Sequence, residues 1–231
     1  MVPGNLYSES IPLTDPEYFI TLYPNPRTGI VLFLWPVLPN SFKFVLQIII
    51  MPEISYEEAE KLLRKYVKDK ELLRHSAAVS KYVYEISLGI KKRHPELKID
   101  PEKLRVAGLL HDIGKDLGKS HLHHINGGRL LRSLGCPEIA RIIEKHTFAK
   151  EASEYENISG DFEPKTLEEK LLTYADAYVI FRPVSFEERM KDIEERRTRR
   201  NPGTLKIIEM GKPRIIKILK EVDKLLGEED E

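Results

Sequence analysis

The feature that most constrains the fold of this chain is an apolar run that ends abruptly in two adjacent polar residues, His111 and Asp112. The run follows Asp100, a typical helix cap, and Pro101, a typical first helical residue, and its apolar side chains recur at helical spacing. We expect Gly114 to supply the left-handed position that ends this helix. His111 and Asp112 then lie at the last turn of a buried helix, where a divalent metal would satisfy both side chains.

Composition limits the class of protein around this run. The chain has 231 residues, of which 41% are apolar and 32% charged, a balance that suits a helix-rich protein in water. Its formal net charge is zero, so no overall basic field favours a nucleic acid or an anionic membrane as partner. The single cysteine, Cys136, excludes an internal disulfide and fits a reducing compartment. We therefore expect a cytoplasmic protein without a nucleic-acid partner, in which Cys136 is a buried structural residue.

The first fifty residues differ from the rest, and we place the working domain at residues 51–231. Residues 1–50 are rich in proline, and residues 29–50 are strongly apolar. Three interpretations stay open: Met51 is the natural start and the upstream residues are a misassigned extension, residues 29–50 associate with a membrane, or the segment forms a β-hairpin on the domain. A membrane helix needs about 20 apolar residues, but two prolines and Lys43 interrupt this stretch at a cost.

Helical periodicity dominates after this extension, and we predict an all-α fold with no further strand. Capping pairs open two of the helices, Ser55 with Glu58 and Thr166 with Glu169. Residues 151–165 are polar and are predicted to form a surface loop. The helices are expected at about residues 55–67, 71–94, 101–111, 123–134, 137–146, 166–181 and 204–226.

The region 184–203 is heavily charged and contains Arg196, Arg197, Arg199 and Arg200. A run of charges on a helix is usually a solvated face, and we interpret this one in that way. A patch for phosphate or RNA is the alternative.

Six residues of types that bind divalent metals occur on separate predicted helices or helix ends. His75 lies on an apolar helix stripe, and Asp176 lies between two alanines on a face that we expect to be buried. A buried carboxylate must pair with a cation or lose its charge. Helical bundles can bring such side chains to one point. In chain order the candidates are His75, His111, Asp112, His123, His146 and Asp176, with His124 as an alternative to His123.

The neighbours of these residues resemble the HD superfamily of metal-dependent phosphohydrolases over roughly residues 72–182. The minimal pattern of that family is a histidine, a His-Asp doublet and a late aspartate, which match His75, His111–Asp112 and Asp176. The whole string at residues 107–115 also agrees with the family. The resemblance implies a helical HD-domain bundle in which these side chains hold a metal.

Two further histidines resemble the extra ligands of dinuclear HD enzymes. His123 stands four residues before Gly127, and His146 lies in the string Lys-His-Thr. The resemblance therefore implies one or two divalent ions, with Asp112 as the bridge between two. Histidine and carboxylate ligands without thiolates favour iron, manganese, cobalt, nickel, zinc or magnesium.

The resemblance implies a phosphohydrolase in which the metal activates water for attack on phosphorus. We expect Asp112 and Lys115 to act in catalysis, and Lys115 and Arg182 to bind substrate phosphate. A solvated cation at a helix end is the alternative for Lys115. The expected partner is a small phosphorylated molecule, and we favour a nucleotide or dinucleotide polyphosphate. A nucleoside monophosphate or cyclic nucleotide stays open, as does a homo-oligomer.

Two other functions stay open on the same residues. A regulatory module would keep the fold and bind a nucleotide or metal without chemistry, but the complete ligand set argues against it. An HD-type di-iron oxygenase would share the helices and the ligands. Dioxygen consumption with reduced iron, against phosphate release with manganese, separates the two enzymes.

Overall fold

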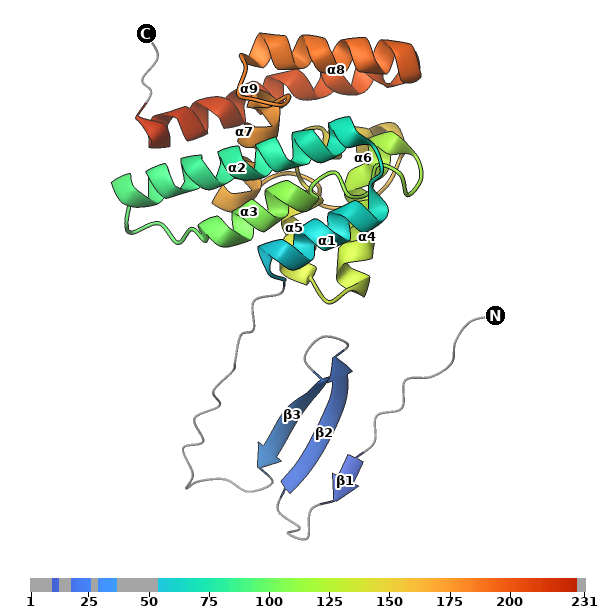
Figure 1. The fold of residues 1–231 in the computed structure, drawn as a ribbon, viewed down its shortest axis with the longest axis vertical. Helices are drawn as coiled ribbons and strands as arrows, with labels where there is room; N and C mark the ends of the chain where they lie inside the picture. Colours follow the sequence, from blue (N-terminus) through green and yellow to red (C-terminus); the bar gives the residue numbers. More distant parts are fainter. Residues whose placement is uncertain (1–9, 13–17, 26–28, 37–53, 228–231) are drawn as a thin grey trace. The chain divides into compact units, whose positions relative to one another are not determined.

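The structure, a computed structural model, describes residues 10–12, 18–25, 29–36 and 54–227. Contacts divide the chain into two units, Met1–Met51 and Pro52–Glu231. The first unit is drawn in blue and the second runs from teal to red (Figure 1).

The first unit contains a three-stranded antiparallel sheet. Its strands are β1 (Ser10–Pro12), β2 (Tyr18–Asn25) and β3 (Gly29–Pro36), in the order β1-β2-β3. β2 and β3 form a hairpin in which Asn25 pairs with Gly29 at the turn. The prediction of a non-helical N-terminal segment is confirmed.

The start of the apolar stretch is therefore a strand, whereas its remainder, residues 37–50, lies outside the described residues. Within the described ranges, no helix has the length and apolar character needed to cross a bilayer. That the upstream residues are a misassigned extension stays a prediction.

The second unit is helical, which confirms the predicted all-α fold. In residues 54–227 the sole β-contact is an isolated bridge between Val179 and Pro183. Short 3₁₀ turns, η1 (Ser120–Leu122) and η2 (Pro202–Thr204), precede two of the helices. The α-helices are α1 (Tyr56–Tyr66), α2 (Lys70–Arg93), α3 (Pro101–Leu110), α4 (His123–Ser133), α5 (Pro137–Ile143), α6 (Ala149–Tyr155), α7 (Leu167–Tyr178), α8 (Phe186–Arg200) and α9 (Leu205–Leu226).

Side-chain caps begin several of these helices where the sequence predicts. Both capping boxes form, at Ser55 with Glu58 and at Thr166 with Glu169. Two helices differ from the prediction. α6 covers the start of the stretch that was expected to be a loop, and α8 covers most of the charged region.

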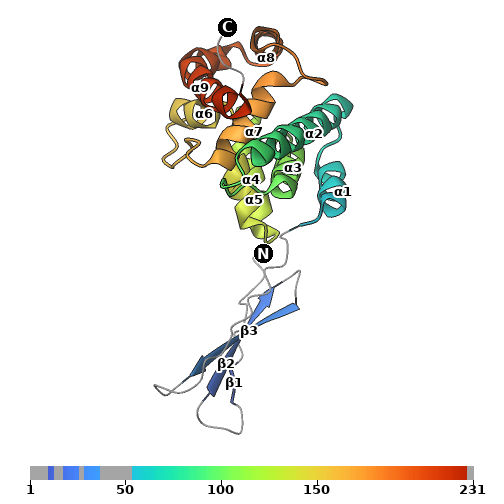
Figure 2. The ribbon, with the colours of Figure 1, turned by 90° about the vertical axis from the view of Figure 1, so that its left-hand side faces the viewer.

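α7 lies inside the unit, with α2, α3 and α5 against one side and α8 and α9 against the other (Figure 2). Its apolar side chains, such as Leu171 and Leu172, are fully buried, and each contributes about 1.5–3 kcal/mol by leaving water. Asp176 is carried into the interior on this helix. α7 therefore holds the late aspartate in the middle of the bundle.

Two glycines set the close approaches around the His-Asp doublet. A Cβ on Gly108 would lie 2.8 Å from Ser80 Cα, so only glycine lets α3 pack this closely on α2. A Cβ on Gly114 would collide with the carbonyl oxygen of His123 and the amide of Gly127. The prediction of a left-handed Gly114 is wrong, because this glycine is absent from the residues with positive φ. Its role is to let the turn after Asp112 touch the start of α4.

Candidate metal centre

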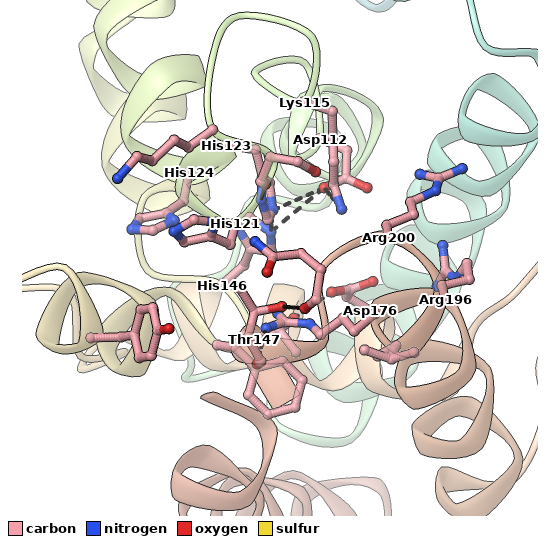
Figure 3. A pocket seen from close by; sticks show the side chains of 18 of the residues that line it. Asp112, Lys115, His121, His123, His124, His146, Thr147, Asp176, Arg196 and Arg200 are labelled. Atoms are coloured by element: carbon pink, nitrogen blue, oxygen red, sulfur yellow. Dashed lines mark hydrogen bonds and ion pairs between the residues drawn. The ribbon is translucent and has the colours of Figure 1, made fainter. Parts of the chain in front are cut away.

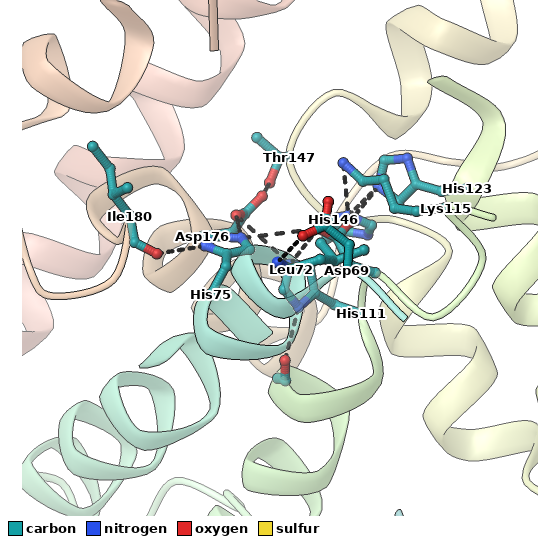
Figure 4. A network of polar contacts seen from close by, with 12 residues as sticks. Asp69, Leu72, His75, His111, Lys115, His123, His146, Thr147, Asp176 and Ile180 are labelled. Carbon is teal, nitrogen blue, oxygen red and sulfur yellow. Dashed lines mark hydrogen bonds and ion pairs between the residues drawn. The ribbon is translucent and has the colours of Figure 1, made fainter. Parts of the chain in front are cut away.

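The six predicted ligands lie together inside the helical unit (Figures 3 and 4). They come from α2, from the turn after α3, from the first residue of α4, from the turn after α5 and from α7. We call these six residues the candidate centre. Their ligand atoms form three groups, within each of which every pair lies within 4.8 Å: His75, His111 and Asp112; His111, His146 and Asp176; and Asp112, His123 and His146.

Asp112 lies in the middle and presents one carboxylate oxygen to each side. Its Oδ2 lies 3.5 Å from His111 Nε2 and 3.9 Å from His75 Nε2. Its Oδ1 lies 3.0 Å from His123 Nε2 and 3.9 Å from His146 Nε2. A carboxylate flanked by two histidine pairs has the geometry to serve two cations at once, which fits the bridging role expected for it.

Asp176 completes the first side of the centre. Its Oδ1 lies 3.1 Å from His75 Nε2 and 3.7 Å from His111 Nε2. On the second side, the Nε2 atoms of His123 and His146 lie 2.9 Å apart. Two lone pairs this close repel each other unless a proton or a metal ion lies between them.

A backbone carbonyl orients each histidine of the candidate centre. The Nδ1–H groups of His111, His123 and His146 donate to the carbonyl three residues earlier, over 2.7, 2.8 and 2.5 Å. His75 Nδ1–H donates to the carbonyl of Ile180 over 2.8 Å. These bonds place the proton on Nδ1 and direct the Nε2 lone pair to the centre, which is the tautomer that a metal needs.

His124, the alternative to His123, lies outside the candidate centre. Its Nε2 forms a 2.9 Å hydrogen bond with Ser153 Oγ, and its ring packs edge-on against Phe162. Burial lowers the pKa of His124 to about 2, so this imidazole is neutral. The structure therefore brings His123 to the centre and uses His124 in packing.

Two buried atoms of the candidate centre have no hydrogen-bond partner among the described residues: His111 Nε2 and Asp112 Oδ1. The side chains are 0% and 4% exposed. An unsatisfied buried polar atom costs about 1–3 kcal/mol, and more when it is charged. A divalent ion would accept a lone pair from each, so the donor set fits histidine and carboxylate ligation of such an ion.

The protonation states also suit metal binding. Burial raises the pKa of Asp112, but the Lys115 ammonium and the neighbouring imidazoles outweigh it and hold that pKa well below its usual value. Arg189 does the same for the buried Asp176. Burial lowers the pKa of His146 to about 3 and also lowers the pKa of the centre histidines on α2 and α4. Ionised carboxylates and neutral imidazoles are the forms that bind metals.

The family model for the HD domain matches residues 72–179, the segment that carries the whole candidate centre. An uncharacterized protein of Methanocaldococcus jannaschii is 34% identical to this chain over 161 residues, which make up 67% of this chain and 94% of that protein. The chain belongs to the HD-domain family. This is a family of the metal-dependent phosphohydrolase type, whose domains bind divalent metals.

Two longer relatives match about half of this HD-domain chain. A tRNA (cytidine(56)-2'-O)-methyltransferase of Picrophilus torridus is 30% identical over 123 residues, which cover 51% of this chain and 34% of that protein. A ribonuclease Y of Alkaliphilus metalliredigens is 32% identical over 118 residues, covering 51% of this chain and 23% of that enzyme. The chain thus spans about a third of the first protein and about a quarter of the second. No solved structure matches it.

The candidate centre is called the HD centre from here on. Arg189 and Thr147 support it but were not predicted from the sequence. Arg189 Nη2 donates to Asp176 Oδ1 over 2.7 Å, and its Nε donates to the Asp176 carbonyl over 2.9 Å. The Thr147 hydroxyl donates to Asp176 Oδ2. Thr147 has a φ of 38°, a left-handed value that costs a β-branched residue about 1–3 kcal/mol. Arg214 fixes this strained turn by donating to the Thr147 carbonyl over 2.6 Å.

A cavity of about 520 Å³ opens onto the HD centre (Figure 3). Asp112, His123, His146 and Asp176 line its inner end. Lys115 lines it too, with Nζ 3.4 Å from Asp112 Oδ1. Lys115 therefore lies at the cavity beside the centre, and its binding of a substrate phosphate stays a prediction.

The other phosphate ligand expected from the sequence lies elsewhere. Arg182 does not line this cavity, and its side chain is 72% exposed and paired with Glu188 at 3.4 Å. The bridge between Val179 and Pro183 closes a tight turn that directs Arg182 outward. The interpretation of the charged region as a solvated face is wrong in part, because three of its arginines line the cavity instead: Arg196, Arg197 and Arg200.

Proposed function

We propose that the helical unit is a metal-dependent phosphohydrolase that acts on a nucleotide or dinucleotide polyphosphate, with one or two divalent ions held by the HD centre. Asp112 carries this proposal. It is a buried and ionised carboxylate whose Oδ1 forms no hydrogen bond in the described part of the chain, although Lys115 Nζ lies 3.4 Å from it. It lies between histidines whose lone pairs face it. Such an atom has little use in a structural core and a clear use beside a cation.

The chain offers two adjacent sets of ligands around Asp112. His75, His111 and Asp176 would hold an ion on one side, and His123 and His146 on the other. Bound divalent ions would lower the pKa of a water towards about 7 and stabilise negative charge on phosphoryl oxygens. The backbone carbonyls that hold each Nδ1–H keep the ligand atoms in place through the reaction.

The ammonium group of Lys115 is a cation of the protein itself, in addition to any metal ion, beside this centre. Its side chain is 28% exposed, so its ammonium reaches both Asp112 and the cavity. A mobile ammonium at this place would bind a phosphoryl oxygen and orient the phosphate for in-line attack.

The nucleotide part of the proposal draws on the relatives. The names of the two longer relatives, a ribonuclease and a tRNA methyltransferase, both refer to RNA, a polymer of nucleotides. The cavity lies in the size range of small-molecule sites, about 300–1,000 Å³. We therefore favour a small nucleotide, and in particular a nucleotide or dinucleotide polyphosphate, as the substrate.

A metal analysis combined with a phosphate-release screen tests this function. We expect the purified protein to bind manganese, cobalt, nickel, iron, zinc or magnesium and to hydrolyse a nucleotide, with release of phosphate or of a shorter nucleotide. Asp112→Asn should lose at least 100-fold in activity and most bound metal, since it removes the shared carboxylate. Asp116→Asn, an exposed aspartate four residues later, should change neither.

Two results would contradict the proposal. Full activity of Asp112→Asn would show that the HD centre is not the site of hydrolysis. Tight nucleotide binding without phosphate release or any other cleavage of the nucleotide under any metal would favour a regulatory module, and dioxygen consumption with reduced iron would favour an oxygenase.

A further inference from the structure

The C-terminal half of α8 presents three arginines to the cavity of the HD centre. Arg196, Arg197 and Arg200 line it, and Figure 3 shows Arg196 and Arg200 beside each other on the same helix, on the side of Asp176. Arg199, in the same run, is exposed and lies outside the cavity lining. Three arginines of this charged stretch therefore face the cavity, whereas Arg199 lies on the surface outside it.

Nearby carboxylates balance the charge of these three cations only in part. Arg196 pairs with Asp192 at 2.6 Å, but Asp192 also binds Arg189 at 2.9 Å. Within residues 54–227, neither Arg197 nor Arg200 forms an ion pair. Arg197 instead donates to the Thr204 carbonyl over 2.8 Å and stacks on Phe148. Burial lowers the pKa of Arg197 to about 10, so it stays charged at neutral pH.

Like charges at neighbouring positions of a helix repel each other, and this arrangement therefore costs stability in the empty cavity. The guanidinium of Arg197 is held in place by a carbonyl and an aromatic ring, so it cannot turn away into water. Guanidinium groups fixed around a cavity are well suited to bind phosphate, which they contact through paired N–H groups. An anion in the cavity would relieve the repulsion.

The backbone positions of these arginines lie further along α8 than the level of the HD centre. Arg189, which binds Asp176, marks the level of the centre on this helix. With a rise of about 1.5 Å per residue, Arg196 lies about 10 Å and Arg200 about 16 Å further along the axis. A series of ion pairs connects the HD centre to these arginines: Asp176 pairs with Arg189, Arg189 with Asp192, and Asp192 with Arg196.

We infer that Arg196, Arg197 and Arg200 form a second anion subsite, which binds a phosphate of the substrate other than the one that is hydrolysed. This inference rests on the proposed function and gives it a substrate class: a nucleotide that carries at least two phosphates. Tyr155 fits the nucleoside part, because its ring is 40% exposed and lines the same cavity.

A small polyphosphate explains the subsite better than an RNA strand does. The cavity has a volume of about 520 Å³, which suits an enclosed small ligand. An RNA-binding domain typically carries a net basic charge, whereas the formal net charge of this chain is zero. The cavity itself is basic, because six lysines and arginines line it against three acidic residues.

Steady-state kinetics on matched substrates test the subsite. The substrates are para-nitrophenyl phosphate, a nucleoside monophosphate, the matching triphosphate, a dinucleoside tetraphosphate and a short oligoribonucleotide. For the double variant Arg197→Ala/Arg200→Ala we expect kcat/KM on the polyphosphates to fall by about 10- to 100-fold, mainly through KM, the loss expected for charged hydrogen bonds. Activity on para-nitrophenyl phosphate should stay within about twofold of wild type. Arg199→Ala should match wild type on every substrate.

Equal loss on para-nitrophenyl phosphate would overturn the subsite, since the arginines would then support the HD centre or the fold. No loss on any polyphosphate would overturn it too. A loss confined to the oligoribonucleotide would replace the polyphosphate with an RNA strand. Arg200→Ala alone, at an exposed position that cannot disturb the core, should show part of the effect.

Failure of the proposed function can be told apart from failure of the subsite. If wild type hydrolyses none of these substrates, calorimetric titration with inorganic tripolyphosphate measures the subsite directly. The double variant should bind tripolyphosphate about 10-fold or more weakly than wild type and than Arg199→Ala. Equal affinity in all three proteins would refute the subsite whatever the chemistry of the HD centre.

Discussion

Removing the guanidinium of Arg189 should destabilise the metal-free protein far more than the metal-bound protein. Arg189 and Asp176 have side chains that are 4% and 8% exposed, and Nη2 lies 2.7 Å from Oδ1. Removing one partner of a buried ion pair leaves the other charge uncompensated, which lowers the free energy of unfolding by about 3–5 kcal/mol. Arg189→Met keeps most of the aliphatic length, so this cost would come from the charge rather than from a cavity.

A bound divalent ion changes that balance, because it gives Asp176 a second cationic partner. We expect the loss in the presence of saturating manganese to fall to about 1–2 kcal/mol, the contribution of the hydrogen bonds that remain missing. Urea unfolding followed by far-ultraviolet circular dichroism, with EDTA or with manganese, measures both values. Arg182→Met is the matched control, because its exposed ion pair with Glu188 is worth about 0–1 kcal/mol.

The reasoning would be refuted by a loss below about 1 kcal/mol in EDTA, which would mean that Asp176 is not held as a buried anion. An equal loss with and without manganese would show that no metal lies near Asp176. Only the combination of a large loss in EDTA and a small loss with manganese supports both the buried pair and the HD centre.

Two further predictions concern the histidines. His123→Ala should lose bound metal and His124→Ala should keep it, as measured by metal analysis after dialysis; the reverse order would move the ligand to His124. On acidification from pH 7 to pH 5, metal-free protein should lose about 2 kcal/mol for each of His124 and His146, because these imidazoles, with pKa values of about 2 and about 3 when folded, take up a proton only on unfolding. Urea unfolding at both pH values measures this; greater stability at pH 5 would contradict it.

The residues of the HD centre could be predicted from the sequence because each stands out against its own helix. His111 and Asp112 interrupt an apolar run, and Asp176 lies between alanines on a face that proves to be buried. Their convergence could not be predicted from periodicity alone, which gives the face of a helix but not its neighbours. It depends on close contacts such as that of Gly108 with Ser80, which a one-dimensional pattern does not contain.

The apolar periodicity of the sequence does not decide whether His123 or His124 faces the centre. Adjacent residues on a helix point about 100° apart, so one position decides which imidazole faces the centre. That phase is set by the 3₁₀ turn η1, which delivers His123 as the first residue of α4. The turn has no apolar pattern of its own, and the start of α4 that follows it lies in close contact with Gly114.

The charged region was misinterpreted for a different reason. A high density of charges predicts a solvated face only when the charges are spread around the helix. In α8 the residues Arg189, Asp192, Arg196 and Arg200 follow one another at intervals of three, four and four, which places them along one stripe. Their exposure rises along that stripe, from 4% for the side chain of Arg189 to 36% for that of Arg196 and an exposed Arg200.

That gradient explains how one helix can serve both the HD centre and the proposed subsite. The buried side of α8, with Phe186, Met190 and Ile193, anchors it on the core next to the polar stripe. The stripe therefore follows the border of the core, first against Asp176 and then along the cavity wall. At the far end of the stripe, Arg196 shares Asp192 with Arg189, and Arg200 forms no ion pair within residues 54–227. A substrate that brings its own negative charge along the same line is the partner that this helix lacks.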